Sequence, residues 1–319
     1  MERHLDFEKP ILDIEKTIER LKVRDSKGKG IHADKIVELE RRRQAAIKEV
    51  YGQLTPWQTV QIARHPQRPV LQDYIGSIFT DFVELHGDRA FGDDSALIGG
   101  FATIGSKKVM LMGHNRGKNV EENFKRNFGM ARPEGYRKAL RLMHLAEKFK
   151  LPVVSFVDTM GAYPGLDAEE RGQHEAIARN LAEMARLETS VIIVVIGEGG
   201  SGGALGIGVG DAVLMLSNAI YSVISPEGCA SILWRDGSFA PDAAEALKVT
   251  ARSLLALGVI DEIITEPPGG AHRYPEAVAA EVKTAVLKHC KALSSFTPAK
   301  LIARRLEKFS AMGTYTETK

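Results

Sequence analysis

The chain has 319 residues, enough for about two domains, and 44% of them are hydrophobic, as in an ordinary globular protein. Its 43 Lys and Arg residues nearly balance 41 Asp and Glu residues, so the net charge gives no reason to expect a nucleic-acid or membrane partner. Cys229 and Cys290 lie far apart without a CxxC neighbour. Together with the lack of a signal peptide or a spanning apolar run, they predict a reduced, cytoplasmic protein with no zinc site of its own.

Residues 1–70 are predicted to form a helical extension and a connector that precede the body of the protein at residues 71–319. Apolar residues recur at helical spacing before a polar, glycine-containing break at residues 25–30, and again sparsely from Ala33 to about Val50. Such a hairpin has one narrow apolar stripe, so it either packs on its own body or also grips a partner subunit. Residues 56–73 contain several prolines and predict an extended connector.

The body is predicted to be α/β, because short apolar runs alternate with helical patterns. The clearest element is a helix over 133–149, with Pro133 in its first turn and Glu134 beside its positive end. The other expected helices cover 74–85, 168–187, 203–210, a segment opened by Ser225 and Pro226, 275–293 and 298–309. The expected strands cover 97–104, 108–113, 153–158, 190–196, 212–216 and 221–224.

A glycine-rich stretch from Gly197 to Gly210 directly follows an expected strand. It contains a formal GxGxxG match, which is typical of dinucleotide binding when it opens a strand–helix–strand unit. The match lies deep in the chain, and about twenty residues further, at 220–222, no acidic residue is present to bind a ribose. No Lys-Ser or Lys-Thr follows the glycines either, so the sequence argues against both a dinucleotide site and a phosphate loop.

The same glycines favour a site made of backbone donors. Gly199, Gly200, Gly202 and Gly203 remove side chains where a strand turns into a helix, so free N–H groups at the positive helix end approach a ligand oxygen closely. This pattern predicts an oxyanion hole. The alternative interpretation is that small residues let the following helix pack tightly on the sheet, and the two interpretations are compatible.

A second turn of this kind is expected at 158–165, where Gly161 and Ala162 are candidate donors. Asp158 either caps this turn or acts as a base, and the cap is favoured. Ser201 lacks the surroundings of a nucleophile elbow, and the sequence has no His-Glu-x-x-His motif and no paired carboxylates at an obvious catalytic spacing. Two backbone-donor turns without a nucleophile indicate a reaction through an enolate, with the base supplied by the cofactor.

Eight Lys and Arg residues stand against three glutamates between residues 114 and 141. This segment is either a solvated face or a surface that receives an acidic partner or a CoA phosphate group. Arg132 and Arg137 are the candidates for contact with CoA or with a carrier protein.

Six segments of the chain closely resemble the carboxyltransferase alpha subunit of multi-subunit acetyl-CoA carboxylase. The likeness extends over essentially the whole chain and is carried by Asn127–Arg141, Asp158–Gly165, Ala168–Leu181, Val195–Leu205, Ser225–Trp234 and Glu266–Arg273.

The resemblance implies a crotonase-like fold of repeated β-β-α units. It also implies an enzyme that transfers the carboxyl group of carboxybiotin, held on the biotin carboxyl carrier protein, to acetyl-CoA to form malonyl-CoA, the first committed step of fatty acid biosynthesis. The implied assembly is α2β2 with a beta subunit that bears a zinc ribbon, and biotin carboxylase completes the ATP-dependent holoenzyme. No metal is expected in this chain.

Within the resembling segments, Gly202, Gly203 and the N–H of Ala204 match the family's oxyanion turn, and Gly161 with Ala162 matches the neighbouring turn. The resemblance assigns both turns to the biotin carbonyl, with Gly199 and Gly200 in the same stretch. Met160 departs from the family pattern, in which a proline is expected at this position of the turn. Methionine restores an N–H group and loosens the turn, which bears on where Gly161 is placed.

Two other functions remain open at this point. A crotonase-type hydratase or hydrolase acting alone would place a carboxylate beside the oxyanion turn, and Glu198 is the one nearby candidate. A non-catalytic scaffold would bind a partner through the N-terminal hairpin and the basic segment, but it would leave the glycine turns unexplained.

Overall fold

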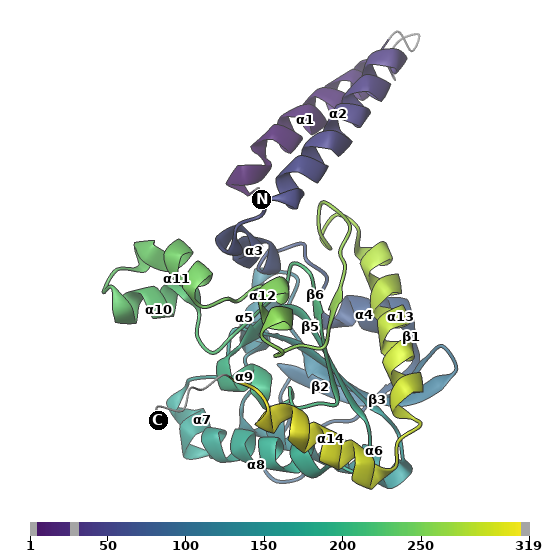
Figure 1. Ribbon diagram of the computed structural model, residues 1–319, viewed down its shortest axis with the longest axis vertical. Coiled ribbons are helices and arrows are strands. Elements are labelled where there is room, and N and C mark those ends of the chain that lie inside the picture. Colours follow the sequence, from purple (N-terminus) through teal and green to yellow (C-terminus); the bar gives the residue numbers. More distant parts are fainter. Residues whose placement is uncertain (1–4, 26–31, 314–319) are drawn as a thin grey trace, which may run out of the picture.

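The structure, a computed structural model, describes residues 5–25 and 32–313. An eight-stranded sheet lies at its centre, helices surround the sheet, and a helical hairpin projects from one end of the molecule (Figure 1). No helix within the described ranges is long and apolar enough to cross a membrane.

The sheet is mixed, with an antiparallel part and a parallel part. The strand order is β1-β2-β3-β4-β5-β6-β8, and β7 pairs with the end of β5. Strand β2 pairs antiparallel with both β1 and β3, and every pairing from β3 onward is parallel. The strands are β1 (Phe79–Glu84), β2 (Leu97–Ile104), β3 (Lys107–His114), β4 (Val153–Thr159), β5 (Val191–Gly200), β6 (Ala212–Leu216), β7 (Ile220–Ser222) and β8 (Glu262–Ile264).

Helices cover the sheet and extend beyond it. They are α1 (Lys9–Asp25), α2 (Ala33–Gly52), α3 (Pro56–Ala63), α4 (Leu71–Ile78), α5 (Val120–Lys125), α6 (Pro133–Phe149), α7 (Leu166–Glu170), α8 (Gln173–Arg186), α9 (Ser201–Leu205), α10 (Pro226–Leu233), α11 (Ala240–Ala246), α12 (Ala251–Ala256), α13 (Pro275–Leu293) and α14 (Pro298–Ser310). Short 3-10 turns lie at Asp6–Glu8, Asn127–Gly129 and Gly237–Phe239.

Helix α6 has the predicted bounds. Pro133 occupies its first turn, and the helix ends at Lys150, whose φ of 55° is left-handed. Tyr136, Ala139 and Met143 recur at helical spacing and are fully buried on the face turned to the core, whereas Leu140 is half-buried.

The predicted extended connector at 56–73 is wrong. Thr55 and Gln58 form a capping box, in which the Thr55 hydroxyl oxygen accepts the Gln58 N–H at 3.2 Å and the Gln58 side chain accepts the Thr55 N–H at 2.9 Å. Because Pro56 stands at the first helical position, it favours α3 instead of breaking it. The helix predicted at 74–85 is also wrong, since α4 ends at Ile78 and the next six residues pair with β2 as β1.

Three further predicted elements change. The expected helix at 168–187 is divided into α7 and α8 by Gly172, whose φ of 81° is left-handed. The expected strand at 190–196 continues to Gly200, and the expected helix at 203–210 is replaced by the short α9. Gly197, Gly199 and Gly200 therefore belong to a strand.

The N-terminal hairpin joins the body only at its base (Figure 1). Helices α1 and α2 bury Ile18, Leu21 and Leu39 against each other. The predicted break at 25–30 lies mostly outside the described residues. The hairpin projects from the body (Figure 1), and its contact with a partner subunit stays a prediction.

A polar network attaches the lower end of the hairpin to the body. The Glu8 carboxylate accepts the Tyr51 hydroxyl at 2.8 Å and pairs with Arg273 at 3.0 Å. Glu8, His65 and His272 also bring their ligand atoms within 4.8 Å of one another. Burial alone would raise the pKa of Glu8, but hydrogen bonds from His272, Tyr51 and Arg273 outweigh it and lower the pKa to about 2. A charged carboxylate therefore joins the hairpin to the body.

Helix α3 belongs with the body by packing. Val60 and Ala63 are buried in one cluster with Ile220, Ala244 and Val249. By packing, the hairpin therefore ends near Gly52, and α3 belongs to the body. The domain boundary at residue 70 stays a prediction.

Candidate functional site

The two predicted donor turns touch each other. Strands β4 and β5 are parallel neighbours, so their carboxyl ends deliver both turns to one edge of the sheet. A Cβ atom on Gly203 would collide with the carbonyl carbon of Gly161 and the nitrogen of Ala162, and would lie 2.6 Å from the Gly161 oxygen. Glycine is therefore required at 203 by the close approach of the second turn.

The start of α9 supplies free N–H groups. Gly200 is the residue before the helix, and the first helical turn leaves the N–H groups of Ser201, Gly202 and Gly203 without an acceptor inside the helix. The helical pattern pairs the N–H of Ala204 with the carbonyl of Gly200. Gly202 and Gly203 are thus the donors without an acceptor in the regular helical pattern, and the donor role of Ala204 stays a prediction.

Ser201 bends the chain from β5 into α9. Its φ of 53° lies in the left-handed region, which is uncommon for any residue other than glycine. Strained backbone of this kind is concentrated at functional sites.

In the second turn, where a proline was expected at Met160, the side chain of Thr159 holds the backbone of Gly161. The N–H of Gly161 donates to the Thr159 hydroxyl oxygen at 3.2 Å, and that hydroxyl donates to the Gly161 carbonyl at 2.6 Å. The Gly161 N–H is therefore engaged, and Ala162 is the candidate donor of this turn. The Met160 side chain is 44% exposed.

The predicted glycines differ in what surrounds them. A Cβ on Gly199 would lie 2.6 Å from the Tyr221 ring, so this glycine serves close strand packing. A Cβ on Gly200 would collide with the carbonyl group of Met160, so this glycine serves the close approach of the second turn. Gly161, by contrast, has nothing within 4 Å of a Cβ, and at Gly202 the nearest atom is 3.9 Å away. The side of the site at Gly161 and Gly202 is open to a ligand.

Buried polar residues that sequence patterns did not single out support α9 from behind. The Tyr136 hydroxyl donates to the Gly203 carbonyl at 3.2 Å. The Asn180 amide donates to the carbonyls of Tyr136 and Gly206 at 3.0 and 2.8 Å. The Asp158 N–H donates to His114 Nδ1 at 3.4 Å, and burial lowers the pKa of His114 to about 3, so the imidazole is neutral.

The carboxylates nearest to the turns are occupied. Asp158 accepts the Glu198 N–H of the neighbouring strand β5 at 3.0 Å and pairs with Arg116 at 3.2 Å, so its carboxylate joins two strands and is not free. Glu198 is buried and bound by Arg64 at 2.6 Å. Glu198 is therefore poorly placed to act as the free acid of a hydratase.

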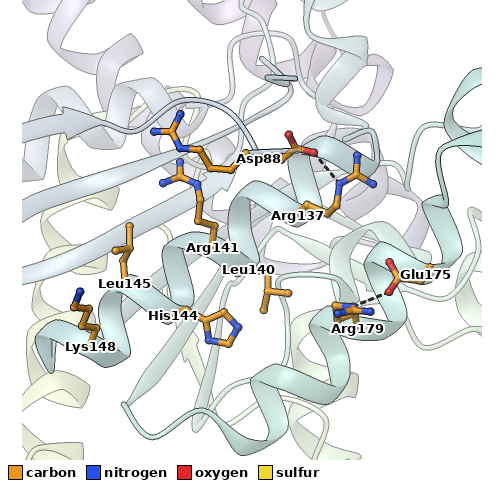
Figure 2. Close-up of a pocket in the computed structure, with 10 residues that line it drawn as sticks. Asp88, Arg137, Leu140, Arg141, His144, Leu145, Lys148, Glu175 and Arg179 are labelled. Carbon is orange, nitrogen blue, oxygen red and sulfur yellow. Dashed lines mark hydrogen bonds and ion pairs between the residues drawn. The ribbon is translucent and has the colours of Figure 1, made fainter. Parts of the chain in front are cut away.

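The basic segment at 114–141 does not form a single patch. Lys118 pairs with Asp73, and other cations of the segment pair with carboxylates in the same way. Arg132 pairs with Asp167 at 3.3 Å and lies 4.6 Å from the Tyr163 ring, beside the second donor turn. Arg137 instead faces a separate pocket on the outer side of α6 (Figure 2).

This sheet edge, with two touching donor turns and its nearby carboxylates held in ion pairs, defines a class of enzymes that stabilise an oxyanion through main-chain N–H groups. Residues 4–313 match the family of acetyl co-enzyme A carboxylase carboxyltransferase-like proteins. An acetyl-coenzyme A carboxylase carboxyl transferase subunit alpha of Bordetella avium is 53% identical over 99% of this chain and 98% of its own length. The corresponding subunit of Burkholderia multivorans is 55% identical over 98% of this chain and 97% of its own length.

Solved structures share the fold. Transcarboxylase 12S with methylmalonyl-coenzyme A and methylmalonic acid bound has a TM-score of 0.55 at 20% identity, over 79% of this chain and 44% of that chain. A Pseudomonas malonate decarboxylase hetero-tetramer in complex with malonate has a TM-score of 0.55 at 16% identity, over 69% of this chain and 89% of that chain.

The chain belongs to the family of acetyl-CoA carboxylase carboxyltransferase alpha subunits. The predicted α/β crotonase-like fold and the predicted class, an enzyme subunit of carboxyl transfer, are confirmed. Complete β-β-α units occur as β2-β3-α6 and β6-β7-α10, with single strand–helix units between them.

Proposed function

We propose that this chain is one half of a split carboxyltransferase, which moves the carboxyl group of carboxybiotin on the biotin carboxyl carrier protein to acetyl-CoA. The observation that carries the proposal is the contact between the two donor turns, open on the side of Gly161 and Gly202. In the described part of the site, the nearby carboxylates Asp158 and Glu198 are bound by arginines. The chain therefore offers oxyanion stabilisation without a base.

The residues of the site fit the carbonyl oxygen of a biotin ring. Gly202, Gly203 and Ala162 present the candidate N–H donors, and the missing side chains at Gly161 and Gly202 leave room for a flat ring. Carboxybiotin supplies the carboxyl group and, once freed of it, the base. The donors of this chain hold the ring oxygen and stabilise negative charge as it develops there.

The finer parts of the proposal concern substrate and setting. Acetyl-CoA is held largely by a partner chain, and its product is malonyl-CoA, the first committed product of fatty acid biosynthesis. The predicted α2β2 assembly with a zinc-ribbon beta subunit, the association with biotin carboxylase and the cytoplasmic location are part of this proposal and rest on the family.

An apolar surface supports the existence of a partner. Val223, Ile232 and Leu233 are 75%, 70% and 67% exposed, and Trp234 and Phe239 are exposed beside them. Helices α10 and α11 project from the body at this place (Figure 1). Large exposed apolar side chains in one region mark protein–protein contact sites.

One residue of this apolar surface, Val223, lies near the donor turns. A mainly apolar pocket of about 350 Å³ is lined by Ser201 and Leu205 of the α9 turn and also by Tyr221 and Val223. A beta subunit seated on the α10 surface would therefore reach the edge of the site, where it would complete the binding of acetyl-CoA.

The test is the reverse reaction, decarboxylation of malonyl-CoA that depends on biocytin. We expect no turnover with this chain alone and turnover after mixing with its beta subunit. Leu233→Asp should prevent the complex, whereas Leu306→Asp, a similarly exposed position on α14, should leave it intact. Turnover by the chain alone would favour an independent crotonase-type enzyme, and a stable complex without turnover would favour the scaffold.

A further inference from the structure

A second pocket lies on the outer face of α6, away from the donor turns. Its volume is about 670 Å³, within the range of pockets that bind small molecules, which is roughly 300–1,000 Å³. The loop that carries Asp88 and Arg89 forms one side, and α6 and α8 form the others. Figure 2 shows Arg141 directed toward that loop, with Leu140 and His144 directed toward α8.

The pocket carries an excess of positive charge. Arg137 pairs with Asp88 at 2.8 Å, and Arg179 pairs with Glu175 at 2.6 Å, so both acids of the pocket are neutralised. Three further cations line it: Arg89, Arg141 and Lys148. Within residues 5–25 and 32–313, no carboxylate forms an ion pair with any of these three.

Arg89 and Arg141 are held near each other although their charges repel. Burial and the neighbouring Arg89 guanidinium lower the pKa of Arg141. Arg141 is fixed by donating to the carbonyls of Gly87 at 3.0 Å and His86 at 3.1 Å. An anion between the two guanidinium groups would remove this repulsion.

The loop that presents Arg89 is built for a fixed position. Arg89 has a left-handed φ of 66°, an uncommon conformation for a long side chain. The buried Asp88 carboxylate accepts the N–H groups of Ala90, Phe91 and Gly92 at 2.8–3.0 Å and so holds the loop closed. Strained residues held in this way are typical of functional positions.

We propose that this pocket binds a nucleotide, with its phosphate groups between Arg89, Arg141 and Lys148. Guanidinium groups match phosphate oxygens in pairs, and the lysine adds a point charge. Leu140 and Leu145 form an apolar floor for the base, and His144 lies beside it. Two kinds of ligand carry such phosphate groups: a free nucleotide, and the 3′-phosphorylated adenosine diphosphate end of coenzyme A.

Calorimetric titration of the full chain at low ionic strength tests the proposal, with ADP, 3′,5′-ADP, coenzyme A and pyrophosphate as separate probes. We expect ADP to bind and Arg89→Ala and Arg141→Ala each to weaken binding at least about tenfold. Arg186→Ala, an exposed arginine of α8 outside the pocket, is the control and should leave binding within about twofold.

Arg89→Ala is the safer variant for folding, because Arg141 also holds the loop. Binding of coenzyme A and 3′,5′-ADP but not ADP, with the same dependence on Arg89, would support the pocket and assign it to the substrate. Pyrophosphate binding as tightly as ADP would contradict the role of the apolar floor. Failure of every probe to bind, or equal affinity in Arg89→Ala and Arg186→Ala, would overturn the proposal.

Discussion

His114 shows how a single buried residue couples the site to pH. Its imidazole lies at the end of β3, is fully buried and accepts the Asp158 N–H behind the donor turns. The unfolded chain takes up a proton at this residue below about pH 6.5. The folded protein cannot do so until about pH 3, because burial lowers the pKa.

We therefore expect the free energy of unfolding to fall as the pH drops from 6.5 toward 3, by up to a few kcal/mol for this group. His114→Asn keeps an acceptor for the Asp158 N–H but cannot take up the proton. Its stability at pH 7 should be lower because a small void is left, and its loss between pH 7 and pH 5 should be smaller. Urea denaturation at both pH values measures the difference.

His144→Asn, at an exposed position of α6, is the matched control and should keep the pH dependence of the unaltered protein. Parallel pH curves for His114→Asn and the unaltered protein would show that His114 does not carry this effect.

At the scale of elements, α14 is anchored by one arginine. Arg305 is 1% exposed, donates to the carbonyls of Leu187 at 3.0 Å and Thr189 at 2.9 Å, and pairs with the buried Asp211 at 2.8 Å. The helix is thereby attached to the end of α8 and to the start of β6. Removing the guanidinium would take the donor from the carbonyls of Met184, Leu187 and Thr189, and it would leave the Asp211 carboxylate with the Val191 N–H but without its cation.

Arg305→Met should lower the free energy of unfolding by about 3–5 kcal/mol, the cost of breaking a buried ion pair. Arg304→Met, which loses only an exposed contact with the Phe296 ring, should cost about 1 kcal/mol or less. Thermal and urea denaturation compare the two variants. Equal losses would contradict the anchoring role of Arg305.

Elements with strong local signals were predictable from the sequence. Helix α6 has a clear apolar face and an initial proline, and its bounds were correct. Strand β1 was missed, because as an edge strand with exposed polar residues it lacks an apolar run. Strand β5 was drawn too short because its glycines suggest a turn, whereas they pack against Tyr221 and against the turn after β4.

The candidate site was predictable in part. The glycine pattern identified both turns, but the N–H of Gly161 is bound by the Thr159 hydroxyl within its own turn. The supports behind the site, Tyr136 and His114, escaped prediction because their partners lie far away in the sequence. Contacts of this kind follow from the fold and not from a local motif.

The whole molecule has the features of one half of an enzyme. The donor turns lie at an open sheet edge, an apolar surface around α10 stands beside them, and the hairpin projects without covering either (Figure 1). A chain that functioned alone would be expected to bury such apolar side chains. The proposed beta subunit explains the exposure and supplies the missing part of the site.

The most direct test compares Gly203→Ala with Gly76→Ala, an exposed position of α4 outside the site, in the assembled enzyme, by the kcat of biocytin-dependent malonyl-CoA decarboxylation. Ala at 203 collides with the second turn, so misplaced donors should lower kcat by about 10²–10³-fold. Ala at 76 meets nothing within 4 Å and lies outside the site, so kcat should change little. Equal activity of the two variants, with assembly intact in both, would contradict catalysis by the touching donor turns.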